Sequence, residues 1–183
     1  MKFIQLPLRG AYVIEPEPYQ DKRGTFVRLF CKDELKRIKN TREIVQINHS
    51  ITVQKGAVRG MHYQRRPKAE IKIVKCLCGA IFDVIIDLRK GSPTFLKWYG
   101  EILSAENMRM LYIPEGFAHG FQTLESNSEL LYFHTEFYSP RHEGGIRYDD
   151  PRVGIQWPLE VVEISERDMN HPLINDNFSG ISI

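Results

Sequence analysis

The sequence predicts an all-β fold, a β-sandwich or jelly roll with only a few short helices. Short apolar runs rich in Val, Ile, Phe and Tyr recur along the chain, and turn residues separate them. Helical character is confined to two short stretches. A chain of 183 residues most often forms one domain, and residues 1–183 contain no linker, repeat or low-complexity segment. We therefore expect a single all-β domain.

The expected strands follow from the apolar runs and from the turn residues between them. In one run, Phe82, Val84, Ile86 and Leu88 share a parity, so one face of that strand is expected to be fully apolar. Turn signals such as Asp21-Lys22-Arg23-Gly24 bound the runs. In chain order the expected strands are Ala11–Glu15, Thr25–Phe30, Ile44–Val53, Val58–Gln64, Ile71–Cys78, Ala80–Leu88, Met110–Ile113 and Glu129–Phe137.

Two segments are expected to be helical. In Cys31–Asn40 the acidic side chains come early and the basic ones late, as the helix dipole favours. A shorter helical turn is expected near Ser165–Met169.

The composition excludes several classes of protein. Hydrophobic content of 42% and charged content of 26% are ordinary for a globular chain, and no run approaches the length of a membrane span. No apolar N-terminal core precedes a small-residue cleavage site, so we expect a cytoplasmic protein with no membrane partner. Cys31, Cys76 and Cys78 are expected to be reduced packing residues, because two of them would share a face of one strand and form a strained disulfide.

Charge is unevenly distributed although the net charge is only +2. Residues 1–75 hold 17 Lys and Arg against 7 Asp and Glu, which raises the possibility of an anionic partner. The basic residues are scattered and not clustered in one tract, so we expect no nucleic-acid partner. A small phosphorylated ligand fits this charge distribution better than a nucleic acid does. The simpler alternative is that the basic first part and the acidic second part of the chain neutralise each other within one domain.

Two motifs each contribute one histidine. Their sequences are Val58-Arg59-Gly60-Met61-His62-Tyr63-Gln64 and Ile113-Pro114-Glu115-Gly116-Phe117-Ala118-His119-Gly120-Phe121. They resemble the paired motifs of a cupin-type jelly-roll β-barrel. Metal-binding cupins usually place a second histidine where this chain has Gln64, which is a poor ligand for a transition metal. We therefore expect no metal, and histidines that do proton chemistry.

With further motifs, the chain from Gly10 to Pro172 resembles the dTDP-4-dehydrorhamnose 3,5-epimerase family. That resemblance implies a homodimer with shared active sites and no cofactor. It also implies a nucleotide-linked 4-keto-6-deoxyhexose substrate, and the leading candidate is dTDP-4-keto-6-deoxy-D-glucose. The further motifs are Asp21-Lys22-Arg23-Gly24, Gln46-Ile47-Asn48-His49-Ser50, Gly91-Ser92-Pro93-Thr94-Phe95, Leu103-Ser104-Ala105-Glu106-Asn107, Tyr138-Ser139-Pro140, Glu143-Gly144-Gly145 and Ile155-Gln156-Trp157-Pro158.

The resemblance assigns four residues to proton transfer. His62 matches the general base, and an imidazole titrates near neutral pH. Asp168 matches the carboxylate that orients it. Tyr132 matches the proton donor on the opposite face of the sugar. Lys72 matches the cation near the C4 oxygen, where a desolvated charge would stabilise an enolate.

Nine further residues match ligand-contacting positions. Arginine suits phosphate oxygens, so three of them are expected around the nucleotide. Tyr138 matches the position that stacks on the base, and it shares parity with Tyr132, so an unbroken strand would put both on one face. The nine are Arg23, Phe26, Gln46, Asn48, Arg59, His119, Tyr138, Glu143 and Arg167.

Three departures from the family pattern bear on substrate identity. Arg28 stands where the family usually has a glutamate, Ile47 is apolar where a polar or acidic residue is common, and Glu70-Ile71 replaces glutamine–glycine. The alternatives left open are epimerisation at one centre only, a sugar carried by another nucleotide, and a metal-dependent cupin such as a dioxygenase. A non-catalytic sugar-binding cupin is a further alternative if Tyr132 or Asp168 points away from His62.

Overall fold

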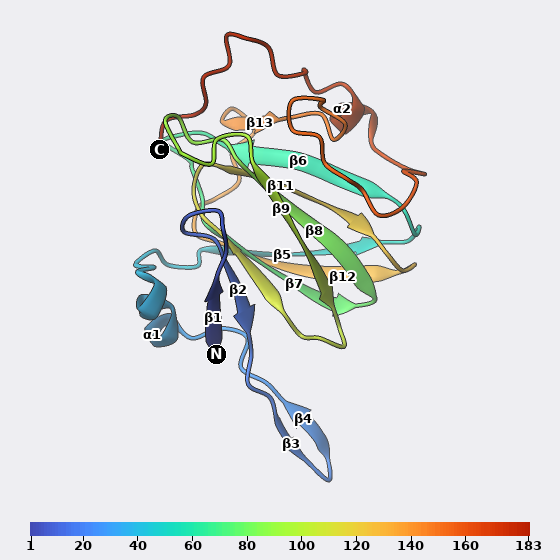
Figure 1. The fold of residues 1–183 in the computed structure, drawn as a ribbon. Helices are drawn as coiled ribbons and strands as arrows, with labels where there is room; N and C mark the ends of the chain where they lie inside the picture. The colour runs from blue at the N-terminus through green and yellow to red at the C-terminus, as the bar shows by residue number, and fades with distance from the viewer.

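Two antiparallel sheets face each other in the computed structural model, which describes residues 1–183 (Figure 1). The six-stranded sheet has the order β1 (Lys2–Gln5), β2 (Tyr12–Glu15), β10 (Met110–Ile113), β7 (Lys72–Cys78), β12 (Ser128–His134) and β5 (Gln46–Thr52). The five-stranded sheet has the order β13 (Glu143–Gly145), β6 (Val58–Gln64), β11 (Phe117–Thr123), β8 (Ala80–Asp87) and β9 (Trp98–Ser104). The predicted all-β jelly roll is confirmed, with the sheets stacked and not closed into a barrel.

A third, two-stranded hairpin projects from this body. It consists of β3 (Tyr19–Asp21) and β4 (Gly24–Phe26), and it extends well past the end of the sandwich (Figure 1). The strand predicted over Thr25–Phe30 is therefore wrong beyond Phe26, because after the hairpin the chain leaves the ladder and returns toward the body. No other strand pairs with this hairpin.

Most predicted strands are confirmed to within a few residues, and five strands were missed: β1, β3, β9, β11 and β13. The reason is clearest for β11. All seven of its residues are buried, so it lacks the apolar–polar alternation that marks a half-exposed strand. The strand predicted to run to Phe137 ends at His134, so the parity of Tyr132 and Tyr138 does not place them on one strand.

Helix is confined to short turns. The predicted Cys31–Asn40 helix divides into α1 (Lys32–Leu35) and a 3₁₀ turn, Lys36–Ile38, which ends where Lys39 adopts a left-handed φ of 59°. The predicted turn near the C-terminus is α2 (Glu166–Met169). Its N-cap is Ser165, whose Oγ accepts a hydrogen bond from the Asp168 N–H at 3.1 Å. No helix in the structure is long and apolar enough to cross a bilayer.

Apolar side chains fill three layers. Between the sheets, Val74, Leu111 and Leu130 of one sheet meet Ile85 and Phe121 of the other. The N-terminal segment and α1 cover the outer face of the six-stranded sheet, and the C-terminal segment covers that of the five-stranded sheet.

The predicted apolar face of β8 packs in the layer on the outer face of the five-stranded sheet. Val84, Ile86 and Leu88 pack under the C-terminal segment, together with Ile155 and Ile181. The opposite face of β8 carries the buried Asp83 toward the interior. Apolar periodicity therefore predicted a buried face but not which of the two layers would bury it.

All three cysteines are free, as expected. Cys76 is buried and Cys31 half-buried, but Cys78 is exposed and is not a packing residue. The ladder between β7 and β12 shifts register between Glu129 and Leu130, opposite this end of β7, so the simple alternation of faces does not extend to Cys78.

Leu111→Ala should lower the free energy of unfolding by about 2–5 kcal/mol, because Leu111 is fully buried between the sheets and its truncation leaves a cavity. Ile102→Ala on the exposed face of β9 is the control and should change stability by about 0.5 kcal/mol or less. Urea denaturation at one protein concentration measures both. Equal losses in the two variants would contradict this account of the core.

Candidate active site

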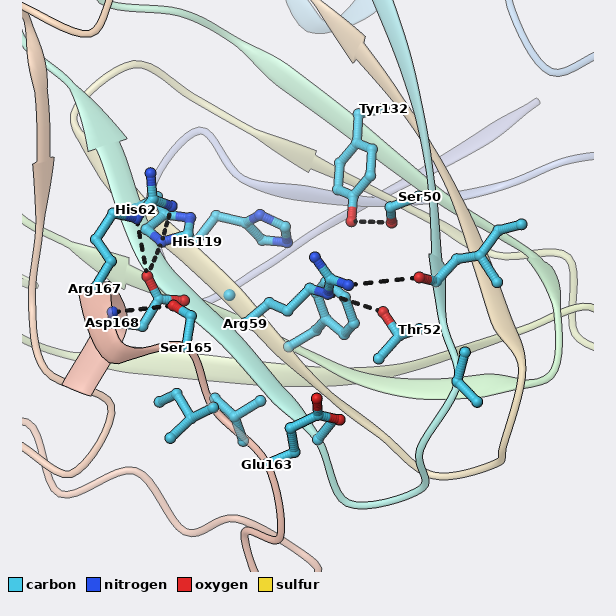
Figure 2. A pocket seen from close by; sticks show the side chains of 17 residues that line it. Ser50, Thr52, Arg59, His62, His119, Tyr132, Glu163, Ser165, Arg167 and Asp168 are labelled. Carbon is cyan, nitrogen blue, oxygen red and sulfur yellow. Dashed lines mark hydrogen bonds and ion pairs between the residues drawn. The ribbon is translucent and has the colours of Figure 1, made fainter.

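A cleft of about 610 Å³ opens between the sheets and the segment that leads into α2 (Figure 2). Strands β5, β6, β11 and β12 supply most of its walls, and Glu163, Ser165 and α2 close one side. Six of the predicted site residues line it: Arg59, His62, His119, Tyr132, Arg167 and Asp168. Tyr132 lies across the cleft from His62 and Asp168, with Arg59 and His119 between them (Figure 2).

His62 and Asp168 form a close pair although they are 106 residues apart in the chain. The His62 Nε2 and Asp168 Oδ1 atoms are separated by 2.7 Å, and the Asp168 side chain is only 4% exposed. The Gly60 N–H donates to the other carboxylate oxygen at 3.1 Å. The pairing requires glycine at position 60, since a Cβ there would lie 2.6 Å from the Gly120 Cα on the neighbouring strand.

This pair fixes the protonation of the site. Burial opposes ionisation of Asp168, but the hydrogen bond and positive charge of His62, the Gly60 N–H and Arg167 outweigh burial and hold its pKa below the ordinary 3.8. A carboxylate accepts hydrogen bonds only, so we assign the His62 proton on that side to Nε2 and the free lone pair to Nδ1. Arg167 Nη2 lies 3.0 Å from the same Nε2, but both atoms then carry hydrogens, and Glu143 and Asp168 are the acceptors for Arg167.

A second histidine–carboxylate pair lies deeper. The His119 Nε2 is 2.7 Å from Asp83 Oδ1, and both residues are buried. Burial lowers the pKa of His119, with Asp83 opposing the shift, so the ring is neutral at physiological pH. Tyr132 contacts the Ser50 hydroxyl at 3.0 Å, and burial raises the pKa of the Tyr132 phenol, so it keeps its proton and can donate it.

Arg59 is suited to an anion. Its guanidinium donates to Thr52 Oγ1 at 3.0 Å and to the Ile51 carbonyl at 3.5 Å, and both of these acceptors are neutral. A guanidinium held by neutral acceptors keeps donors for phosphate oxygens.

A smaller cavity of about 150 Å³ shares His62 with the main cleft. Five more predicted residues line it: Gln46, Asn48, Lys72, Tyr138 and Glu143. The Tyr138 hydroxyl donates to Glu143 at 2.9 Å, which ties the end of the cavity together. Lys72 Nζ lies 3.4 Å from Glu70, and the same carboxylate is 2.6 Å from His134 Nδ1.

Arg23 and Phe26 lie in neither cavity. They belong to the projecting β3–β4 hairpin, where the Arg23 side chain is 88% exposed and Phe26 is 75% exposed. Arg28 follows this hairpin, is exposed, and pairs with Glu34 at 2.9 Å.

Several site residues escaped the sequence argument. Ser50 stands in a quoted motif, but its contact with Tyr132 depends on the β5–β12 register, which pairs Ser50 with Leu130 and Asn48 with Tyr132. Asp83 could have been recognised from the sequence, because a charged residue inside an apolar strand is rarely buried without a partner. His171 also lies beside the Asp168 carboxylate. It follows Asp168 by three residues, and this spacing in a predicted helical turn could have suggested the contact.

His62, Asp168 and His171 place their potential ligand atoms within 4.8 Å of one another. The chemistry of the surroundings favours protons over a metal ion in this group. Arg167 places its guanidinium 3.0 Å from His62 and 3.4 Å from Asp168, and a fixed cation there opposes a second one.

The family model described as dTDP-4-dehydrorhamnose 3,5-epimerase matches residues 5–176. The dTDP-4-dehydrorhamnose 3,5-epimerase of Methanothermobacter thermautotrophicus is 45% identical over 179 residues and covers 96% of each chain. The Bacillus anthracis enzyme of the same name, solved with TDP and pyrophosphate bound, superposes with a TM-score of 0.91 at 41% identity, covering 94% of this chain and 99% of that one. The dTDP-6-deoxy-D-glucose-3,5-epimerase of Legionella pneumophila, in complex with dTDP-4-keto-L-rhamnose, gives 0.90 at 41% identity, with 94% and 92% coverage.

Asp168→Asn should make the free energy of unfolding depend less on pH in the acid range. A carboxyl whose pKa is lowered in the folded state stabilises the protein at any pH above the pKa that it has in the unfolded chain. This stabilisation is lost as the pH falls through the pKa of the folded state. At pH 5 the variant should be less stable by roughly 2 kcal/mol, comparable to a hydrogen bond to a charged group. The difference from the natural protein should shrink by pH 3.

Urea denaturation at pH 5 and pH 3 measures this difference. Asp176→Asn is the matched control, because the Asp176 side chain is 97% exposed and its pair with Arg152 is a surface contact. A stability difference between Asp168→Asn and the natural protein that stays constant over this range would contradict the assignment.

Proposed function

The chain belongs to the dTDP-4-dehydrorhamnose 3,5-epimerase family, and we propose from this membership and the site geometry how it acts. The protein is a nucleotide-sugar epimerase whose substrate is a dTDP-linked 4-keto-6-deoxyhexose of the rhamnose pathway. One observation carries the proposed mechanism: the His62–Asp168 pair and the protonated Tyr132 face each other across a single cleft.

The chemistry follows from the ketone. A carbonyl at C4 acidifies the C–H bonds at C3 and C5, so a base can remove either proton and leave an enolate. We assign His62 Nδ1 as that base, with Asp168 holding the ring and stabilising the imidazolium. Tyr132 then gives its proton to the opposite face of the carbon, which inverts the centre, and its raised pKa keeps the phenol protonated until that step. Proton exchange with solvent returns His62 to its neutral form and Tyr132 to its protonated form before the next inversion.

The enolate oxygen needs a positive partner during the reaction. Lys72 lines the cavity that shares His62, and its pair with Glu70 at 3.4 Å is loose enough to leave donors free. The His119 N–H pairs with Asp83, which supports a positioning role for this neutral ring beside the sugar. No step in this sequence requires a cofactor.

The nucleotide is proposed to lie toward the cluster around Arg167. Arg59 and Arg167 offer guanidinium donors for the diphosphate. Tyr138 is half exposed, at the outer end of the smaller cavity, where a base can stack on its ring. Gln46 and Asn48 line the same cavity and carry amides that can pair with the edge of the base.

We propose a homodimer in which the β3–β4 hairpin reaches the partner's cleft. An isolated hairpin with an exposed phenylalanine and an exposed arginine is unstable in water without something to cover it. The outer face of edge strand β5 also exposes Ile47 and Ile51. Three unpaired thiols fit the reducing cytoplasm that we propose as its compartment.

His62→Ala should abolish exchange of the sugar's C3 and C5 hydrogens, with a rate loss of about two to four orders of magnitude. Nucleotide binding should persist, because Arg59, Arg167 and Tyr138 remain. Turnover of the keto sugar in heavy water, with deuterium read at both carbons by NMR, measures exchange, and calorimetry with dTDP measures binding. Normal exchange in the variant would remove His62 from the mechanism.

The shared-site arrangement predicts complementation between two defective subunits. Arg23→Ala removes a hairpin group and His62→Ala a cleft group, so each homodimer should be impaired. In a mixed dimer with crossed hairpins, one cleft carries both defects and the other carries neither. An equimolar mixture after subunit exchange should therefore regain about one quarter of full activity, because half of the dimers are mixed and half of their clefts are intact.

The control is each variant diluted with itself under the same exchange conditions. Hairpins that serve their own cleft leave every cleft with one defect, so the mixture would show no gain. The proposal would also be overturned if light scattering showed a monomer at a protein concentration at which the enzyme is fully active.

A further inference from the structure

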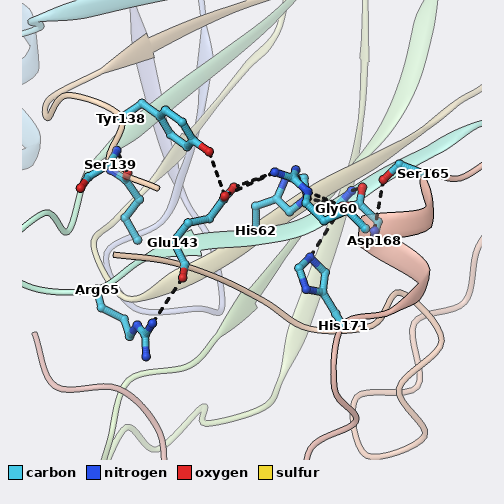
Figure 3. Close-up of polar contacts among 11 residues, drawn as sticks. Gly60, His62, Arg65, Tyr138, Ser139, Glu143, Ser165, Asp168 and His171 are labelled. Carbon is cyan, nitrogen blue, oxygen red and sulfur yellow. Dashed lines mark hydrogen bonds and ion pairs between the residues drawn. The ribbon is translucent and has the colours of Figure 1, made fainter. Parts of the chain in front are cut away.

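A second histidine, His171, lies against the Asp168 carboxylate and has no part in the proposed mechanism (Figure 3). Its Nε2 is 3.6 Å from Asp168 Oδ1, the oxygen that also faces His62. The His171 side chain is 16% exposed, and Nε2 itself is buried without a hydrogen-bond partner. The rings of His62 and His171 meet edge to face, with centroids 5.8 Å apart.

The fold makes a slot for this ring. Strand β13 pairs with β6 so that Gly145 stands opposite His62. A Cβ at position 145 would lie 2.1 Å from the His171 ring, so only glycine leaves room for it there. His171 itself follows α2 by two residues, which brings the ring back over the carboxylate on the same turn of chain. The imidazole is therefore held in place from two separate elements.

We propose that His171 is a positioning residue of the epimerase, which directs its Nε2–H at Asp168 and acts on His62 through that carboxylate. Three nitrogen donors then surround one oxygen: His62 at 2.7 Å, Arg167 Nε at 3.4 Å and His171 at 3.6 Å. The last distance exceeds a normal hydrogen bond, so the contact is electrostatic. The inference rests on the proposed function of the pair.

The charges around His171 support a neutral ring with its proton on Nε2. Burial lowers the pKa of His171, and His62 and Arg167 lower it further, against the opposing pull of Asp168 and Glu143. These four groups, on β6, α2 and β13, are the titratable and charged residues around the ring. A neutral imidazole carries one hydrogen, and a lone pair facing the carboxylate would be repelled by it.

The consequence is a weaker hold of Asp168 on His62. A carboxylate whose charge is shared among three donors stabilises the His62 imidazolium less than one that faces His62 and Arg167 alone. Removing the His171 N–H should therefore make His62 easier to protonate. In this way His171 would hold the base in its unprotonated, reactive form at a lower pH.

Two variants separate the N–H from the ring's bulk. His171→Phe fills the slot without a nitrogen, and His171→Gln restores an N–H near the position of Nε2. NMR titration of the free protein, with histidine ¹⁵N and ring C–H signals assigned, measures the midpoint of the His62 titration without any turnover. The midpoint should rise in His171→Phe by roughly 0.5 unit, less than the loss of a full hydrogen bond would give, and return toward the natural value in His171→Gln.

Turnover provides the second readout. The acid limb of the kcat/KM profile should shift upward by the same amount in His171→Phe and recover in His171→Gln. Asn170→Ala is the control for disturbance of α2, since Asn170 is exposed and its side chain bonds to the Glu166 carbonyl. It should leave both the titration and the profile unchanged.

An unchanged His62 midpoint in His171→Phe would overturn the proposal, as would a ¹⁵N spectrum with the His171 proton on Nδ1. Because the titration is measured without substrate, these results stand apart from the proposed function. A protein that fails to epimerise the keto sugar but shows the predicted titration shift would leave the His171 contact intact and refute the function.

Discussion

The contact between His62 and Asp168 is the constraint on which the rest of the site depends. It joins the middle of β6 to a four-residue helix near the C-terminus, 106 residues away. For the two to meet, the Gly60 backbone must come close to Gly120, the Ser165 hydroxyl must cap α2, and the C-terminal segment must pack across the outer face of the five-stranded sheet. Each of these features is local, and together they hold one carboxylate oxygen 2.7 Å from one imidazole nitrogen.

The protein combines an apolar layer between the sheets with three histidine–carboxylate pairs that are buried or half-buried. His62–Asp168, His119–Asp83 and His134–Glu70 are all at 2.6 to 2.7 Å. A carboxylate taken out of water is strongly disfavoured unless it is paired, so each acid carries its own histidine. The surrounding packing holds these side chains in place, and burial keeps the Tyr132 phenol protonated across the cleft from His62.

The two cavities divide the work of the site. His62 lines both, so the reacting end of a ligand would lie where they meet. The smaller cavity ends at the half-exposed Tyr138, and no residue of the same chain's β3–β4 hairpin reaches it. A packed interior around His62 and an outer end left open by the chain's own hairpin are consistent with the homodimer proposed above.

The sequence by itself determined the all-β class, most strand positions and the types of residue at the site. Alternating apolar runs bury one face of a strand whatever its partner, and His62 and His119 stand within the two quoted histidine motifs, whereas Tyr132 was assigned by the family resemblance alone. The sequence did not reveal β11, which is buried on both faces, or the layer that the apolar face of β8 would join. Contacts such as Ser50 with Tyr132, Asp83 with His119 and His171 with Asp168 were decided by the tertiary structure alone. They join elements that are distant in sequence or turn back on themselves, and only strand register and the path of the C-terminal segment bring their side chains within reach.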